Sequence, residues 1–236
     1  MKKRRFSTEL AYVFGVVFVA LGVVLMEKAD FGVSMVVAPA YLVYRWLSPI
    51  WPFFTFGMAE YCLQAVLLLV MALVLRRFRL SYLFSFVTAV VYGFVLDGLM
   101  LLGGLLPADA VWQRAIYYVL GMLFCAAGVS AMFHTYISPE VYELFVKEVS
   151  ARFRWNINRF KTVYDCVSCL TGVALSFLAF GFGQFEGVKW GTVVCALVNG
   201  WVIGRFSAFY EKHWTFYDRF PLRKYFEPSK KFSATP

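Results

Sequence analysis

Four polar side chains stand inside otherwise apolar stretches of the sequence, and these residues are the best suited to bind a solute or a proton. They are Glu60, Asp97, Asp165 and Asn199. A charged side chain at the centre of a bilayer costs about 2.5–3.5 kcal/mol on insertion scales, so such residues face a bundle interior, pair with a partner or hold a proton. We expect Asp97 to bind a solute or a proton and Asn199 to orient the solute, with Glu60 and Asp165 nearby. A hydrogen bond between packed helices is the alternative role for each of them.

Two serine-containing segments, after the first and fourth apolar stretches, are candidates for contact with the same solute. Ser34 precedes "VVAPAYLVYRW", which is apolar but too short and too interrupted by proline to cross a membrane. Ser138 precedes Pro-Glu, a pattern typical of a helix whose N-cap is the serine. We expect the segments 30–47 and 138–154 to form either re-entrant half-helices that act as gates, or interfacial helices that pack on the bundle.

The composition places all of these residues in a membrane protein. Hydrophobic residues make up 61% of the chain, charged residues 16%, and the mean hydropathy is +0.67, which a water-soluble domain of this length does not show. A membrane-spanning helix needs ~20 apolar residues, and six stretches approach or reach that length: roughly 10–26, 55–75, 81–102, 114–133, 162–182 and 188–206. These stretches lack the alternation of a membrane β-strand, so we expect an all-α, polytopic membrane helix bundle.

The distribution of lysine and arginine predicts the orientation of the bundle. Only four of the 23 basic residues fall on the side away from the termini: Lys28, Arg45, Arg114 and Lys189. Cytoplasmic loops carry an excess of basic residues, so we expect a multi-pass protein of the inner membrane with both termini cytoplasmic. The net charge of +9 then indicates contact with anionic lipids of the inner leaflet rather than binding to nucleic acid.

The sequence contains an internal repeat. The stretch "YVFGVVFVALGVVLM" (12–26) matches "YVLGMLFCAAGVSAM" (118–132) at eight of fifteen positions, with a shift of 106 residues. Weaker matches pair Glu60 with Asp165 and Asp97 with Asn199, at shifts of 105 and 102. Each copy holds three spans, an odd number, so the second copy must be inverted relative to the first. We expect a first repeat over 1–106, a second over 107–207, and a basic, aromatic tail over 208–236.

The sequence contains none of the short motifs of common pumps and hydrolases. There is no G-x-x-x-x-G-K-[ST], no G-x-S-x-G and no H-E-x-x-H, and the chain has only two histidines. We therefore expect no enzymatic activity, no cofactor and no bound metal. The spacing of Cys166 and Cys169 in "CVSC" is also found in metal and redox sites, but inside an apolar helix it is expected to serve packing.

Five stretches along the chain resemble the YczE/YitT-type integral membrane proteins of bacteria. They are "ADFGVSM", "YGFVLDGLM", "ISPEVYELF", "RFKTVYDCVSCLTG" and "GTVVCALVNGWVIGRF", and the resemblance covers roughly residues 8–207. It implies a multi-spanning inner-membrane protein with an internal duplication and a permease-like activity. The stretch before the last span, "GFGQFEGVKWGT", departs from the glycine-rich pattern of that family.

Inverted repeats are typical of secondary transporters, whose sites lie near the midplane where the two halves meet. We therefore expect a transporter or permease for a small polar solute, which could be coupled to protons. Its site is expected between the repeats, at Asp97, Asn199, Glu60, Asp165 and the segments of Ser34 and Ser138. The alternative is a membrane protein that transports nothing and scaffolds or regulates a partner.

Overall fold

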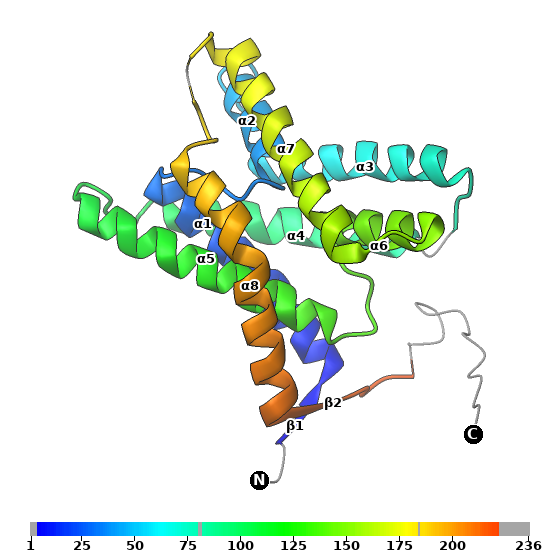
Figure 1. The fold of residues 1–236 in the computed structure, drawn as a ribbon. Helices are drawn as coiled ribbons and strands as arrows, with labels where there is room; N and C mark the ends of the chain where they lie inside the picture. The colour runs from blue at the N-terminus through cyan, green and yellow to red at the C-terminus, as the bar shows by residue number, and fades with distance from the viewer. Residues whose placement is uncertain (1–3, 80–81, 184, 222–236) are drawn as a thin grey trace, which may run out of the picture.

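The computed structural model describes residues 4–79, 82–183 and 185–221, which form eight helices and one small sheet (Figure 1). In chain order the elements are β1 (Arg4–Ser7), α1 (Thr8–Ala29), α2 (Ala38–Leu47), α3 (Phe56–Leu75), α4 (Tyr82–Gly103), α5 (Val111–Phe133), α6 (Val141–Phe153), α7 (Ile157–Phe180), α8 (Trp190–His213) and β2 (Trp214–Tyr217). Of the tail expected over 208–236, residues 222–236 lie outside the described part of the chain.

The six expected spans are confirmed as the six long helices α1, α3, α4, α5, α7 and α8. Each is long and apolar enough to cross a membrane. The first is longer than its apolar core indicates, because the helix begins at Thr8, with Ser7 as N-cap, and continues through Glu27 and Lys28 to Ala29. The chain is thus an all-α, multi-pass membrane protein.

The two spans that share the repeated sequence, α1 and α5, pack directly against each other at the centre of the molecule. Gly15 faces Gly128 and Gly22 faces Gly121, so the start of one helix lies against the end of the other. A Cβ atom on Gly22 would lie 2.6 Å from the carbonyl oxygen of Gly121, and one on Gly128 would lie 2.7 Å from that of Gly15. Small residues at such crossings allow helix backbones to approach closely in membranes. The two repeats are therefore antiparallel along this seam.

Equivalent residues of the two copies touch each other, which locates a pseudo-twofold axis. The rings of Phe18 and Phe124, 106 positions apart, have centroids 5.4 Å apart. The thiol of Cys125 donates to the carbonyl oxygen of Val19, its own equivalent, at 3.7 Å. In a twofold arrangement equivalent positions meet only near the axis, so the axis passes between the middle of α1 and α5.

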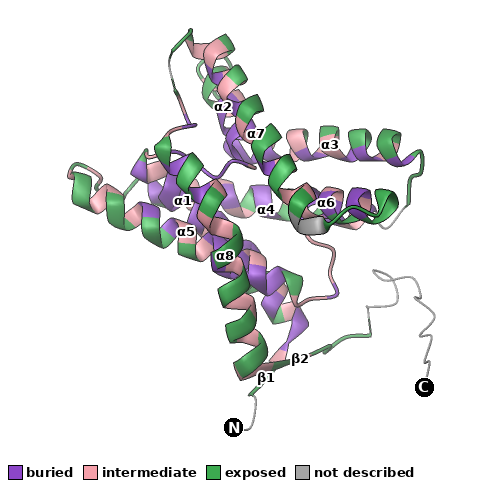
Figure 2. Cartoon of the chain, in the orientation of Figure 1, coloured by how far each residue is buried: buried purple, intermediate pink, exposed green. Residues whose placement is uncertain are grey.

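The remaining helices obey the same symmetry. Helix α2 packs on α7 and its equivalent α6 packs on α3, while α1 packs on α4 and α5 packs on α8. Each short helix is thus covered by a span of the opposite repeat. The purple, buried stretches in Figure 2 include parts of α1, α2 and α4, close to this interface.

The symmetry breaks in the outer pairs of spans. Helices α3 and α4 pack closely, with Gly57 against Gly93, whereas α7 and α8 make few contacts. In the second repeat, the position equivalent to Gly57 is Thr162, 105 residues later, and the position equivalent to Gly93 is Cys195, 102 residues later. Side chains at both positions prevent the same close approach, so α7 and α8 splay apart (Figure 1).

Both ends of the described chain lie together, as an even number of spans requires. Strand β1 pairs in parallel with β2, with Arg4 opposite Trp214 and Ser7 opposite Tyr217. Glu9 strengthens this junction by accepting hydrogen bonds from the backbone N–H groups of Arg219 and Phe220.

The start of α6 differs from the sequence-based expectation. The helix begins at Val141 with Glu140 as N-cap, two residues later than a Ser138 cap would give. The helix has an apolar face, which includes Val141, Leu144 and Val149, and this face is buried among α3, α4 and α7. Gln64 explains the later start, because its side-chain oxygen accepts the backbone N–H of Val141 at 3.0 Å.

Candidate functional site

A pocket of about 60 Å³ lies on the interface between the two repeats. Its walls come from α1, α5, α6, α7 and α8 and from the turns that precede α2 and α6. Val19 on α1 and Asn199 on α8 line it, and each lies near the middle of its span. The pocket is thus at mid-depth in the bundle.

The pseudo-twofold axis runs through this pocket. Ten of the sixteen lining residues form five pairs separated by the repeat shift of 106: Val19 with Cys125, Val23 with Val129, Ser34 with Glu140, Val36 with Tyr142, and Val37 with Glu143. The chemistry of the paired positions differs. The first repeat contributes mainly valine, whereas the second contributes two carboxyl groups and a phenol.

The two short helices begin at the pocket. Ser34, 9% exposed, lines it, and its carbonyl oxygen accepts the backbone N–H groups of Val37 and Ala38 at the start of α2. Glu140 and Tyr142 line it at the start of α6. The N-terminus of each helix carries partial positive charge, and both termini point into the bundle interior, as in the re-entrant arrangement.

The turn before α2 is held in the interior by the start of α8. Gly32 has a φ of +110°, and a Cβ atom there would meet Thr192 and the backbone N–H of Lys189. The backbone N–H of Val33 donates to the carbonyl of Gly187 at 3.0 Å, and Thr192 Oγ1 donates to the carbonyl of Val33 at 2.8 Å. Non-helical backbone is tolerated at membrane depth only where its polar groups are paired in this way.

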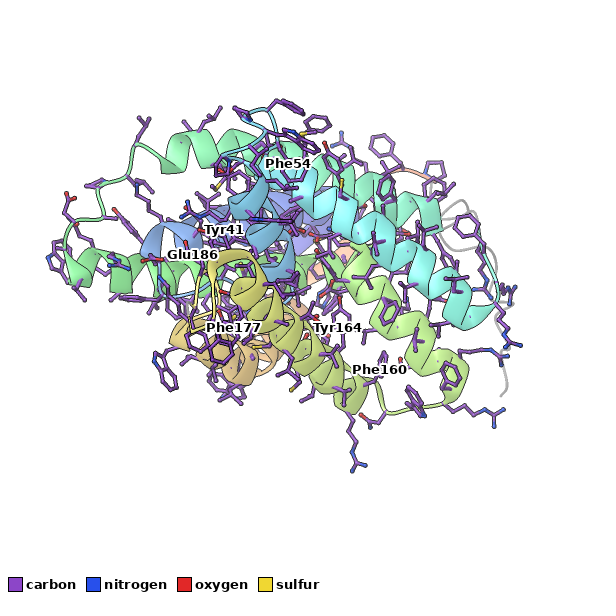
Figure 3. All side chains as sticks on the ribbon, turned by 90° about the horizontal axis from the view of Figure 1, so that it is seen from above. Tyr41, Phe54, Phe160, Tyr164, Phe177 and Glu186 are labelled. Atoms are coloured by element: carbon purple, nitrogen blue, oxygen red, sulfur yellow. The ribbon has the colours of Figure 1, made fainter. Side chains whose placement is uncertain are left out.

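The far end of α2 is tied to the same connection. Arg45 forms an ion pair with Glu186 at 2.9 Å, and Figure 3 shows Tyr41 and Glu186 close together. The α7–α8 connection therefore contacts both ends of α2.

One side of the pocket carries a cluster of charges. Lys161 on α7 lines the pocket and lies 3.5 Å from Glu143 Oε1 and 3.2 Å from Asp165 Oδ1. The three side chains are 31%, 18% and 12% exposed. Asp165 is thus near the pocket as expected, but it reaches the pocket through Lys161.

A second polar cluster lies against α3. Glu60 and Gln64 are both 0% exposed. Tyr142 OH donates to Glu60 Oε2 at 2.9 Å, and Gln64 Nε2 donates to Glu140 Oε2 at 3.2 Å. Burial, together with the charges of Glu143 and Glu60, raises the pKa of Glu140 well above its ordinary value, although the bond from Gln64 opposes this.

Asn199 is the expected site residue with the most available polar atom. It lines the pocket, and its Oδ1 is buried without a hydrogen-bond partner among the residues that the structure describes. Such an atom is stabilised when it accepts a hydrogen bond from a bound solute or water.

Asp97 lies elsewhere and has other partners. Its Oδ2 accepts from Thr55 Oγ1 at 2.7 Å and its Oδ1 accepts from the backbone N–H of Gly57 at 2.7 Å, so it caps the start of α3. Ser138 is also outside the lining; its carbonyl accepts from Thr88 Oγ1 at 3.0 Å. The binding roles expected for these two residues stay predictions that this geometry does not favour.

Five residues around the pocket were not anticipated: Gln64, Glu140, Tyr142, Glu143 and Lys161. Spacing could have indicated two of them. Gln64 follows Glu60 by four residues and Lys161 precedes Asp165 by four, so each pair shares a helix face. The other three are joined to the site by contacts between distant elements.

The chain matched no curated protein and no solved structure. It did match the model of one protein family, over residues 6–208. The matched range includes both repeats and all but the end of α8. The chain therefore belongs to DUF6198, a family of unknown function.

Proposed function

We propose that this protein is a secondary transporter for a small polar solute and that the pocket on the pseudo-twofold axis is its binding site. The position of the pocket carries the proposal, because secondary transporters built from inverted repeats bind at the midplane between the repeats, beside helices that start there. Here α2 and α6 start at the pocket, and equivalent residues of both copies line it.

The side chains favour a solute with a positively charged group. Glu140 and Glu143 line the pocket and Asp165 lies just behind, whereas Lys161 is the basic residue in the lining. A zwitterion also fits, since the N-termini of α2 and α6 favour an anionic group. The small volume of about 60 Å³ favours a solute with few heavy atoms in this state.

The resemblance to YczE/YitT-type proteins supports a permease-like activity in the bacterial inner membrane. The positive-inside rule supports cytoplasmic termini, since 19 of the 23 basic residues lie on the side of the termini. A fluorescent protein that matures only in the cytoplasm, fused to the C-terminus, should fluoresce. A dark fusion at normal expression would reverse the orientation.

A scaffold or regulatory protein is the second candidate. Asp97 supports it, because a carboxylate that caps a neighbouring helix is a structural element and not a solute ligand. The pocket with its unpartnered Asn199 oxygen is what this candidate leaves unexplained.

Filling the pocket should abolish transport. Val129 lines it from α5, and tryptophan there would occupy much of the space. In proteoliposomes, we expect uptake of radiolabelled methylammonium, putrescine or glycine by the wild type and loss of that uptake in Val129→Trp. Val119→Trp is the matched control, because Val119 is on the same helix but 49% exposed, away from the pocket.

Two results would contradict the proposal. Wild-type vesicles that take up none of these probes faster than empty vesicles would remove the solute classes that the pocket favours. Equal loss of uptake in both tryptophan variants would show that the pocket has no special role.

A further inference from the structure

Two carboxyl groups, Glu60 and Glu140, come together beside the pocket although they are 80 positions apart in the chain. Both are buried, at 0% and 7% exposed, and each accepts a hydrogen bond from a neighbouring side chain. Tyr142 bonds to Glu60, and the side-chain amide of Gln64 joins Glu140 to the backbone of Val141. Glu60 Oε1 has no hydrogen-bond partner among the described residues.

The groups that face Glu60 carry no positive charge in the described part of the chain. Tyr142 and Glu140 face it from α6 and its N-cap, Tyr92 from α4 and Tyr164 from α7. On α3 itself the neighbour is Gln64. All of these are neutral or acidic.

The surroundings of Glu140 are similar. Glu143 and Glu60 act on it electrostatically, and it acts in turn on Cys125, Tyr12 and Tyr92. Lys161 shares the pocket lining, but its ammonium group is paired with Glu143 and Asp165. Two buried carboxylates without a cation are costly when both are ionised, so the pair holds at least one proton.

The pair is connected to the pocket. Glu140 and Tyr142 line it directly, and Tyr142 OH donates to Glu60. A proton can therefore pass between Glu60 and the pocket through Tyr142, which accepts one proton as it donates another. A positively charged solute group beside Glu140 favours the ionised carboxylate and expels its proton.

We propose that Glu60 and Glu140 form a proton-binding site that competes with a cationic group of the solute, so that solute and proton exchange across the membrane. This inference rests on the proposed transport function. Glu140 would bind the solute cation directly, whereas Glu60 would act as the proton reservoir, one hydrogen bond behind Tyr142.

The proton site can be tested without a known solute. Infrared difference spectra of the purified full-length protein in lipid, between about pH 5 and about pH 9, report the C=O stretch of protonated carboxyl groups. We expect wild type to show buried carboxyl groups that lose their protons across this range, and Glu60→Gln and Glu140→Gln each to lose one such signal. Asp109→Asn, an exposed loop position, is the control and should leave the buried signals unchanged.

Stability gives a second measurement that does not depend on band assignment. A carboxyl group with a raised pKa in the folded state stabilises the protein at low pH, and that stability is lost as pH rises through the raised value. Glutamine mimics the protonated acid, so Glu140→Gln should fold at least as well as wild type at high pH and flatten the pH dependence of the melting temperature. If Glu140→Gln titrates and melts like wild type, the proton site is refuted.

The exchange step is tested with methylammonium. We expect added methylammonium to decrease the signal of the protonated carboxyl groups in wild type and to leave it unchanged in Glu140→Gln.

If uptake is blocked by Val129→Trp yet insensitive to pH and to Glu60→Gln, the proton coupling fails while the transporter stands. If the carboxyl groups titrate but no probe is taken up, the transport proposal fails while the proton site stands. An uptake that depends on sodium and not on pH would show that the proton is not the coupling ion.

Discussion

Gly22→Ala is expected to destabilise the protein by at least about 2 kcal/mol, because overpacking a tight contact costs about 1–3 kcal/mol and occasionally more. The added methyl carbon would lie 2.6 Å from the carbonyl oxygen of Gly121 and 2.7 Å from the backbone nitrogen of Cys125. Neither atom can move without its helix, so α1 and α5 must separate. The separation would open the central seam on which both repeats pack.

The repeat adds a sharper expectation. Gly128 is the equivalent of Gly22, and a methyl group there meets the carbonyl of Gly15 at 2.7 Å and the nitrogen of Val19 at 2.8 Å. Gly128→Ala should therefore cost about as much as Gly22→Ala. The double variant should cost less than the sum, because one separation of the helices relieves both clashes.

The measurement is the thermal melting temperature of the purified protein in one detergent, followed by size-exclusion chromatography after heating. Gly200→Ala on α8 is the control, since no atom lies within 4 Å of its added Cβ. Alanine is the better helix former by about 1 kcal/mol, so this control should melt at the same temperature or higher. A Gly22→Ala protein that melts with the control would contradict the close packing of α1 on α5.

Lys161→Met is expected to cost about 2–3 kcal/mol, less than the roughly 3–5 kcal/mol for breaking a fully buried ion pair. The side chain of Lys161 is 31% exposed, which lowers the cost, but those of Glu143 and Asp165 are only 18% and 12% exposed. Methionine fills a similar volume, so the loss reflects two carboxylates left without a cation, not a cavity.

A second substitution separates charge from packing. Lys161→Met combined with Asp165→Asn removes one of the two uncompensated charges and should recover part of the lost stability. Lys147→Met, an exposed position on α6, controls for loss of a surface charge and should melt like wild type. If the single and double variants at 161 and 165 melt together, the ion cluster does not stabilise the fold.

The membrane spans and the duplication could be predicted from the sequence because both depend on local information. Each span is an apolar run of sufficient length, and α3 and α4 begin within one residue of the predicted positions. The start of α6 could not be predicted in this way. Ser138 has the local pattern of an N-cap, but Gln64, 77 residues before Val141, supplies the acceptor that fixes where the helix begins.

Only some of the residues of the polar site could be predicted from the sequence. Glu60, Asn199, Asp165 and Ser34 were expected near the repeat interface, and the structure places each in or next to the pocket lining. Their partners were not expected, since contacts such as the bond between Tyr142 and Glu60 join residues 82 positions apart.

The sequence by itself determined six spans and an inverted duplication, since apolar length and a repeat of 106 residues are visible without contacts. Only the tertiary structure decided which member of each repeated pair faces the pocket. Gly57 and Gly93 allow α3 and α4 to approach closely, which brings Asp97 onto the start of α3 as a cap. The second repeat lacks both glycines, so α7 and α8 stay apart, and Asn199, at the equivalent position, lines the pocket.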